Sequence, residues 1–176
     1  MLGRYDFFPD VFHGRLTLRY RIDIRAIQLA ILNVILELND SSVELSEISD
    51  LTGDEEIIVL FEFGFAEGGV FTFIGPDEAR SISRKIEEKP FSLMDFFLVL
   101  KYYRKTANRK PKPLKFDYGI LRFSFGEEVL TIKYFHERGT RRISFSSFIE
   151  YLLDEISSIL GVDREEVFET VDLIEV

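Results

Sequence analysis

Residues 15–38, which read RLTLRYRIDIRAIQLAILNVILEL, decide the fold. Over 15–22 apolar and polar side chains alternate, which is typical of a strand with one buried face and one face carrying Arg15, Arg19 and Arg21. From residue 24 to 38 the polar residues form only a narrow stripe, and Asp23 is in place to cap a helix. The stretch therefore predicts a half-buried strand followed by a central helix that packs across a sheet.

Working outward, the rest of the chain predicts two β-hairpin–helix units. The predicted strands are 57–65, 70–74, 120–125, 129–136 and 141–145. The predicted helices are 24–38, 77–88, 92–105 and 147–160, with a short one after Asp163. We therefore predict an α+β fold in one domain spanning 1–176. Its sheet is antiparallel or mixed, has five to six strands, and carries its helices mainly on one face.

Composition narrows the class of protein. The chain has 176 residues, of which 46% are hydrophobic and 30% charged, so it can bury a core. It has no cysteine, which excludes disulfides, thiolate metal sites and cysteine nucleophiles. We find neither a long uninterrupted apolar run nor a signal-peptide pattern at residues 1–6, and we expect a cytoplasmic protein with no membrane partner. The absence of tryptophan and the many charged residues fit a thermophile.

Charge is segregated along the sequence. No Lys or Arg lies between Arg25 and Arg80, whereas no acid lies between Lys101 and Lys115. If the strands share one sheet, their outward side forms a basic face. This face and the segment 101–115 together are a candidate nucleic-acid or anion site. Its candidate residues are Arg15, Arg19, Arg21, Lys101, Arg104, Lys105, Arg109, Lys110, Arg122, Lys133 and Arg142. The alternatives are a solvated sheet face whose cations pair with the acidic loop, and a surface for an acidic protein.

Two histidines are the basis for any catalytic or metal site. Asp6, Asp10 and His13 fall within eight residues and form the candidate metal set. The alternative is a terminal segment pinned by its aromatic residues, with these polar groups at its edge. His136 lies at a strand end beside Glu137, where a hydrogen-bonded structural role is the alternative to a general base. Phosphate-loop, dinucleotide and hydrolase motifs are absent, so we expect no cofactor and assign no catalytic residue.

The chain also has a surplus of phenylalanine, with 18 in total. Residues 91–100 have almost no polar face, and rings left over from the core can form a subunit or partner interface. Phe91, Phe96, Phe97 and Leu100 are the candidate anchors. The alternative is that this segment is a second central helix.

The sequence alone does not define a cellular role. We expect a non-enzymatic module that self-associates into a homo-oligomer or binds a protein partner. The first alternative is single-stranded nucleic-acid binding by the basic face and the segment 101–115. The second is a small enzyme or metal protein that uses His13 or His136 with nearby carboxylates.

Overall fold

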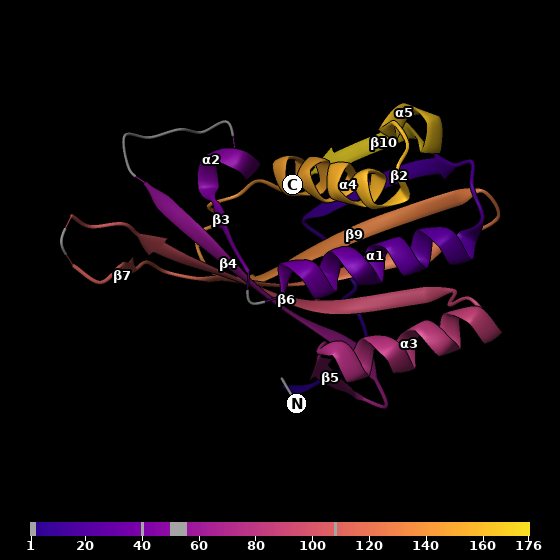
Figure 1. The fold of residues 1–176 in the computed structure, drawn as a ribbon, viewed down its shortest axis with the longest axis horizontal. Helices are drawn as coiled ribbons and strands as arrows, with labels where there is room; N and C mark the ends of the chain where they lie inside the picture. Colours follow the sequence, from indigo (N-terminus) through magenta and orange to yellow (C-terminus); the bar gives the residue numbers. More distant parts are fainter. Residues whose placement is uncertain (1–2, 40, 50–55, 108) are drawn as a thin grey trace.

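The computed structural model describes residues 3–39, 41–49, 56–107 and 109–176. Within these ranges the chain forms one ten-stranded antiparallel sheet with the order β1-β5-β4-β6-β8-β9-β2-β10, while β3 pairs with β4 and β7 with β6 (Figure 1). The strands are β1 (Gly3–Arg4), β2 (Gly14–Tyr20), β3 (Ser42–Glu44), β4 (Ile57–Glu67), β5 (Val70–Phe73), β6 (Leu93–Arg104), β7 (Lys112–Pro113), β8 (Asp117–Phe125), β9 (Val129–Arg138) and β10 (Phe168–Glu175). The α+β class is confirmed, but the sheet is larger than the predicted five to six strands.

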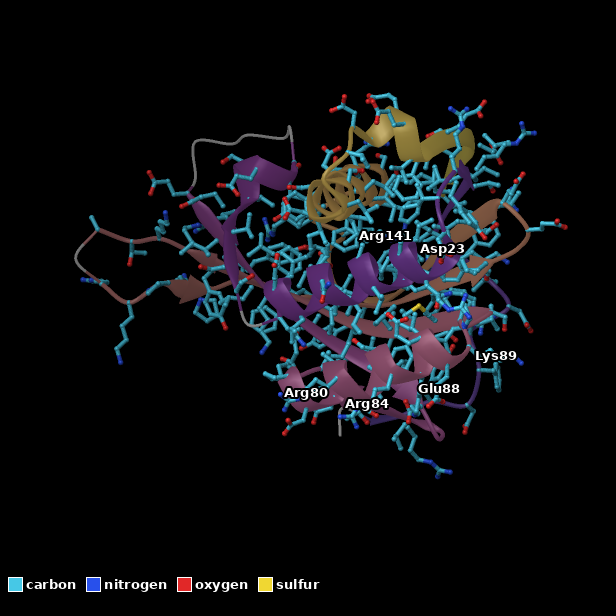
Figure 2. All side chains as sticks on the ribbon, turned by 45° about the vertical axis from the view of Figure 1, so that its right-hand side comes forward. Asp23, Arg80, Arg84, Glu88, Lys89 and Arg141 are labelled. Atoms are coloured by element: carbon cyan, nitrogen blue, oxygen red, sulfur yellow. The ribbon has the colours of Figure 1, made fainter. Side chains whose placement is uncertain are left out.

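The long helices lie side by side over one face of the sheet (Figure 1). They are α1 (Ile24–Leu38), α3 (Pro76–Glu88) and α4 (Phe145–Leu160), and α2 (Leu45–Ile48) and α5 (Arg164–Val167) are short. α1 packs between α3 and α4. Arg80, Arg84 and Glu88 lie on the solvent side of α3 (Figure 2). No helix in the described ranges is long and apolar enough to cross a membrane.

The core lies between this helix layer and the sheet. Phe61 of β4 is only 1% exposed, and its ring contacts those of Phe148 and Tyr151 on α4. Phe96 and Phe123 add an edge-to-face pair from the neighbouring strands, with ring centroids 5.7 Å apart. Burying each such ring stabilises the fold by roughly 2–3 kcal/mol, so this face supplies most of the driving force for folding.

The predicted helix over 92–105 is wrong, because this segment is strand β6. From Met94 to Tyr102 the even-numbered residues of β6 face the helices and are buried. Asp95 and Val99 on the opposite face are also buried, at 8% and 4% exposure. A strand buried on both faces reads as a continuous apolar run, which periodicity alone does not distinguish from a buried helix.

The two ends of the second unit also differ from the prediction. The segment 141–145 is not a strand: Arg141 has a φ of 52°, and Ser144 caps α4 by accepting a hydrogen bond from the Ser147 amide. The sequence also failed to indicate β10, in which a register shift between Thr170 and Asp172 breaks the alternation of side chains.

The N-terminal segment crosses the sheet. β1 pairs with β5 near one edge, whereas β2 lies near the other edge between β9 and β10. Residues 5–13, here called the strap, connect them across the face that the helices leave uncovered. We call this face the open face.

Candidate functional site

A row of charged side chains crosses the open face. Asp95 of β6 pairs in register with Arg122 of β8, which pairs with Lys133 of β9, which pairs with Arg15 of β2. We call these four residues, one acid and three cations, the cation row. The predicted condition that the strands share one sheet is therefore met for Arg15, Arg122 and Lys133.

The strap is fixed over this row at one end by a tyrosine. The Tyr5 ring lies 4.5 Å from the Phe71 ring, and its hydroxyl donates to Asp95 Oδ2 at 2.5 Å. Arg122 donates two hydrogen bonds of 2.8 Å to the same carboxylate. Burial, then the hydrogen bond to Asp95, raise the pKa of Tyr5, and the hydrogen bond to Asp95 raises that of Arg122. Tyr5 therefore stays a neutral donor and Arg122 stays charged.

Aromatic rings of the strap cover the cations themselves. The Arg122 guanidinium lies 5.0 Å from the centre of the Phe8 ring, and Phe8 is buried. Phe12 holds Arg15 and Lys133 at 5.3 and 5.7 Å from its ring centre. Arg15 also bonds Asp172. Arg122 and Arg15 are therefore bonded to carboxylates of the chain, and Lys133 lies against a ring of the strap, so the row faces other parts of the same chain.

The remaining residues of the predicted basic site are dispersed. Arg21 pairs with Glu169, Arg19 is exposed on β2, and Arg142 stacks on the Tyr102 ring at 5.3 Å. Lys101 pairs with Glu62 and Lys105 with Glu44. Arg104 lies at the far end of β6 from Asp95, about 30 Å away at roughly 3.3 Å per residue. Arg109 and Lys110 lie beyond it. The predicted residues thus form two groups, the cation row and the segment after β6.

Beside the strap the open face is apolar. Phe97 of β6, Ile120 of β8 and Phe135 of β9 are paired in register and partly exposed. We call these three residues, two of which are aromatic, the aromatic row. Phe7 and Val11 of the strap are 72% and 61% exposed. The open face therefore carries apolar side chains that the chain covers only in part.

The four predicted interface anchors do not lie together. Phe96 and Leu100 face the helices and are buried in the core. Phe91 is partly buried and packs edge-to-face on Phe65. Phe97 alone of the four lies on the open face.

The two histidines meet at the end of the sheet near a buried carboxylate. Asp117, only 1% exposed, accepts hydrogen bonds from the Tyr102 hydroxyl at 2.7 Å and from the Arg141 and Arg142 amides at 2.8 and 2.9 Å. His136 Nε2 lies 3.2 Å from Asp117 Oδ1. A Cβ at Gly139, where φ is 119°, would lie 2.2 Å from this oxygen, so only glycine lets the turn close here.

These bonds define the chemistry of Asp117. Burial raises the pKa of the carboxyl, but the hydrogen bonds from Tyr102, the two amides and His136 outweigh it and leave the pKa below its usual value. A carboxylate that orients an imidazole is typical of general-base sites. Here the carboxylate is saturated by structural partners, so the arrangement ties β6, β8 and β9 together.

His13 joins this cluster from the strap. Its Nδ1 accepts a hydrogen bond of 2.8 Å from the His136 amide, and its ring packs on Phe135. Burial, Arg141 and His136 lower the pKa of His13. The neutral imidazole is therefore the form that holds the end of the strap.

A metal site is not formed by the predicted residues. Asp6 and Asp10 are exposed, and the Nδ1 atom of His13 is already an acceptor. Among the residues that the structure describes, no group of three or more His, Asp or Glu is arranged to hold an ion. Surface cavities of about 480 and 400 Å³ lie elsewhere, one beside Arg164 and Glu169 and one beside Lys105 and Arg109.

Sequence reasoning missed Asp95, Asp117 and Tyr5, although each fixes part of the open face or its end. A signal was present for Asp95, since it lies inside an apolar run where an acid must be paired. The docking of Tyr5 on it left no local signal.

Comparison with protein-family models, with curated proteins and with solved structures gives no match for this chain.

Proposed function

We propose that the protein is a self-associating module in which the open faces of two copies pack against each other. The feature that carries the proposal is the apolar surface formed by the partly exposed aromatic row and by the exposed outer residues of the strap, Phe7 and Val11. Contiguous apolar surface of this kind is typical of protein interfaces.

The charges next to the aromatic row favour a second copy as the partner. The next row of paired residues along the strands consists of Glu62 of β4, Val99 of β6, Tyr118 of β8 and Arg138 of β9. Glu62 and Arg138 lie at its two ends. A twofold axis parallel to the strands, between β6 and β8, therefore places Glu62 of each copy opposite Arg138 of the other. The same operation places Phe97 opposite Ile120 of the partner.

The Arg138 guanidinium is positioned for such a contact. It stacks at 4.0 Å over the centre of the Tyr118 ring and is exposed. It forms no ion pair with any carboxylate in the described ranges. Glu62 already pairs with Lys101 at 2.6 Å, and a carboxylate can accept from a second cation.

A charge-swap series tests this arrangement by sedimentation equilibrium. Arg138→Glu and Glu62→Arg each remove two symmetry-related pairs, so each should weaken the dimer by about a hundredfold if one pair contributes about tenfold. The double variant restores both pairs in reverse and should recover most of the affinity. Thermal unfolding of each variant controls for folding.

Two results would contradict the proposal. One is a wild-type protein that stays monomeric as its concentration is raised. The other is a dimer that neither single variant weakens, which would place the contact on another surface, such as the exposed edge of β10.

A further inference from the structure

A basic hairpin extends the open face beyond the body of the molecule. β6 continues to Arg104, and β7 returns beside it with Tyr103 paired to Pro113 and Arg104 to Lys112. We call residues 103–107 and 109–116 the basic arm. The arm projects past the helix layer, at the left of Figure 1. Residues 109–113, toward its end, are all exposed.

Four cations of the arm are available for an outside ligand. Arg109, Lys110, Lys112 and Lys115 are all exposed. They make no ion pair with a carboxylate of the described residues, whereas Lys105, which follows the last residue of β6, pairs with Glu44. With no acid between residues 101 and 115, the arm lacks neighbours in sequence that would neutralise them.

An aromatic pair lies where the arm joins the open face. The Tyr103 and Phe116 rings have centroids 5.8 Å apart, and both are partly exposed. Pro113 lies opposite Tyr103 in the ladder. The arm therefore has a stacking surface at its root and, along its length, four cations that form no ion pair with any described carboxylate.

We propose that the basic arm binds single-stranded nucleic acid, with backbone phosphates on Arg109, Lys110, Lys112 and Lys115 and a base against Tyr103 and Phe116. Phosphates require cations, and unpaired bases bind exposed aromatic rings without sequence preference. The net charge of −9 repels a polyanion elsewhere, so binding is confined to the arm and depends strongly on salt. A two-stranded ribbon also fits a duplex major groove, but an aromatic pair at the root favours a strand whose bases are unpaired.

The first measurement is fluorescence anisotropy of a labelled mixed-sequence oligonucleotide, titrated with the full chain at several KCl concentrations. Four phosphate contacts predict a slope of log K against log salt of about −3, at roughly −0.7 per contact. The double variant K110S/K112S should halve this slope. The matched control K85S/K89S removes the same charge from the end of α3, far from the arm, and should leave the slope unchanged (Figure 2).

The second measurement separates stacking from charge. Tyr103→Ala should weaken binding by about five- to a hundredfold without changing the salt slope, and Tyr103→Phe should bind like the wild type. Sedimentation of K110S/K112S should show unchanged self-association, so failure here is distinguishable from failure of the proposed dimer.

Several results would overturn the proposal. Absence of binding at the lowest salt is one. Equal competition by polyglutamate or heparin, together with no effect of Tyr103→Ala, would mean a surface for any polyanion or for an acidic protein. Tighter binding of a duplex of the same sequence would assign the arm to the major groove.

Discussion

The two faces of the sheet are made from the same strands but are closed in different ways. Three helices cover one face, and its side chains, such as Phe96, are completely buried. The other face is covered only along the cation row, by a strap that contributes a few rings. Each face also holds one buried carboxylate, Asp117 on the helix side and Asp95 on the open side. The comparison indicates that one face of a sheet can provide the packing that stabilises the fold, while the other face remains available for contacts with other molecules.

Adjacent residues of β6 give the sharpest test of this division. Phe96→Ala should destabilise the fold by about 3–5 kcal/mol, because it opens a cavity under the helices. Phe97→Ala, on the open face, should cost about 1 kcal/mol. Urea unfolding at several protein concentrations measures both effects. Phe97→Ala should also reduce the dependence of stability on protein concentration. Equal costs at the two positions would show that the open face is as essential to the core as the helix face.

The two carboxylates provide a smaller contrast. Asp117→Ala should cost about 3 kcal/mol, since it leaves the Tyr102 hydroxyl and two amides without their buried acceptor. Asp95→Ala should cost about 1–2 kcal/mol, because the freed Arg122 side chain is 25% exposed and can be hydrated. It should also loosen the strap, which limited proteolysis near Phe7 would detect. Similar costs, with no change in proteolysis, would refute the contrast.

The smallest expected effect is on the pH dependence of stability, through the protonation of His13 in the strap. Because the pKa of His13 is lowered in the fold, the unfolded chain binds the proton more readily. Stability should be full above the unfolded pKa of about 6.5 and fall as the pH drops below it. The neighbours are Arg141 and His136, and protonation also removes the Nδ1 acceptor. His13→Asn should flatten the pH dependence between 7 and 5.5; an unchanged slope would assign it to other groups.

The parts of the fold that the sequence predicts are those with a polar face to define a period. α1, α3 and α4 and the two hairpins fall close to their predicted positions, because each has one buried and one hydrated side. Over 96–100 β6 has apolar residues on both sides, so its two-residue period is hidden in the sequence. β10 is mostly exposed and is interrupted by a register shift, so its apolar residues do not alternate.

The candidate surfaces were predictable only in part. Alternation places Arg15, Arg122 and Lys133 on one side of their strands, and the register then joins them. Their coverage by Phe8 and Phe12 depends on contacts between distant segments, which no local pattern encodes. Neither does the pairing of Tyr5 with Asp95, 90 residues away.

The path of the strap has a consequence for how the chain folds. The His13 side chain meets its partner 123 residues later, and Arg15 meets Asp172 after 157. During synthesis β2 therefore cannot form its hydrogen bonds until β9 and β10 have been made. The strap likewise cannot dock until β8 and β9 have paired to form the surface on which it packs. Contacts of such long sequence separation make folding slow and leave Phe7, Phe8 and Phe12 unprotected meanwhile. The N-terminal segment should thus be the last to acquire protection from hydrogen exchange during refolding.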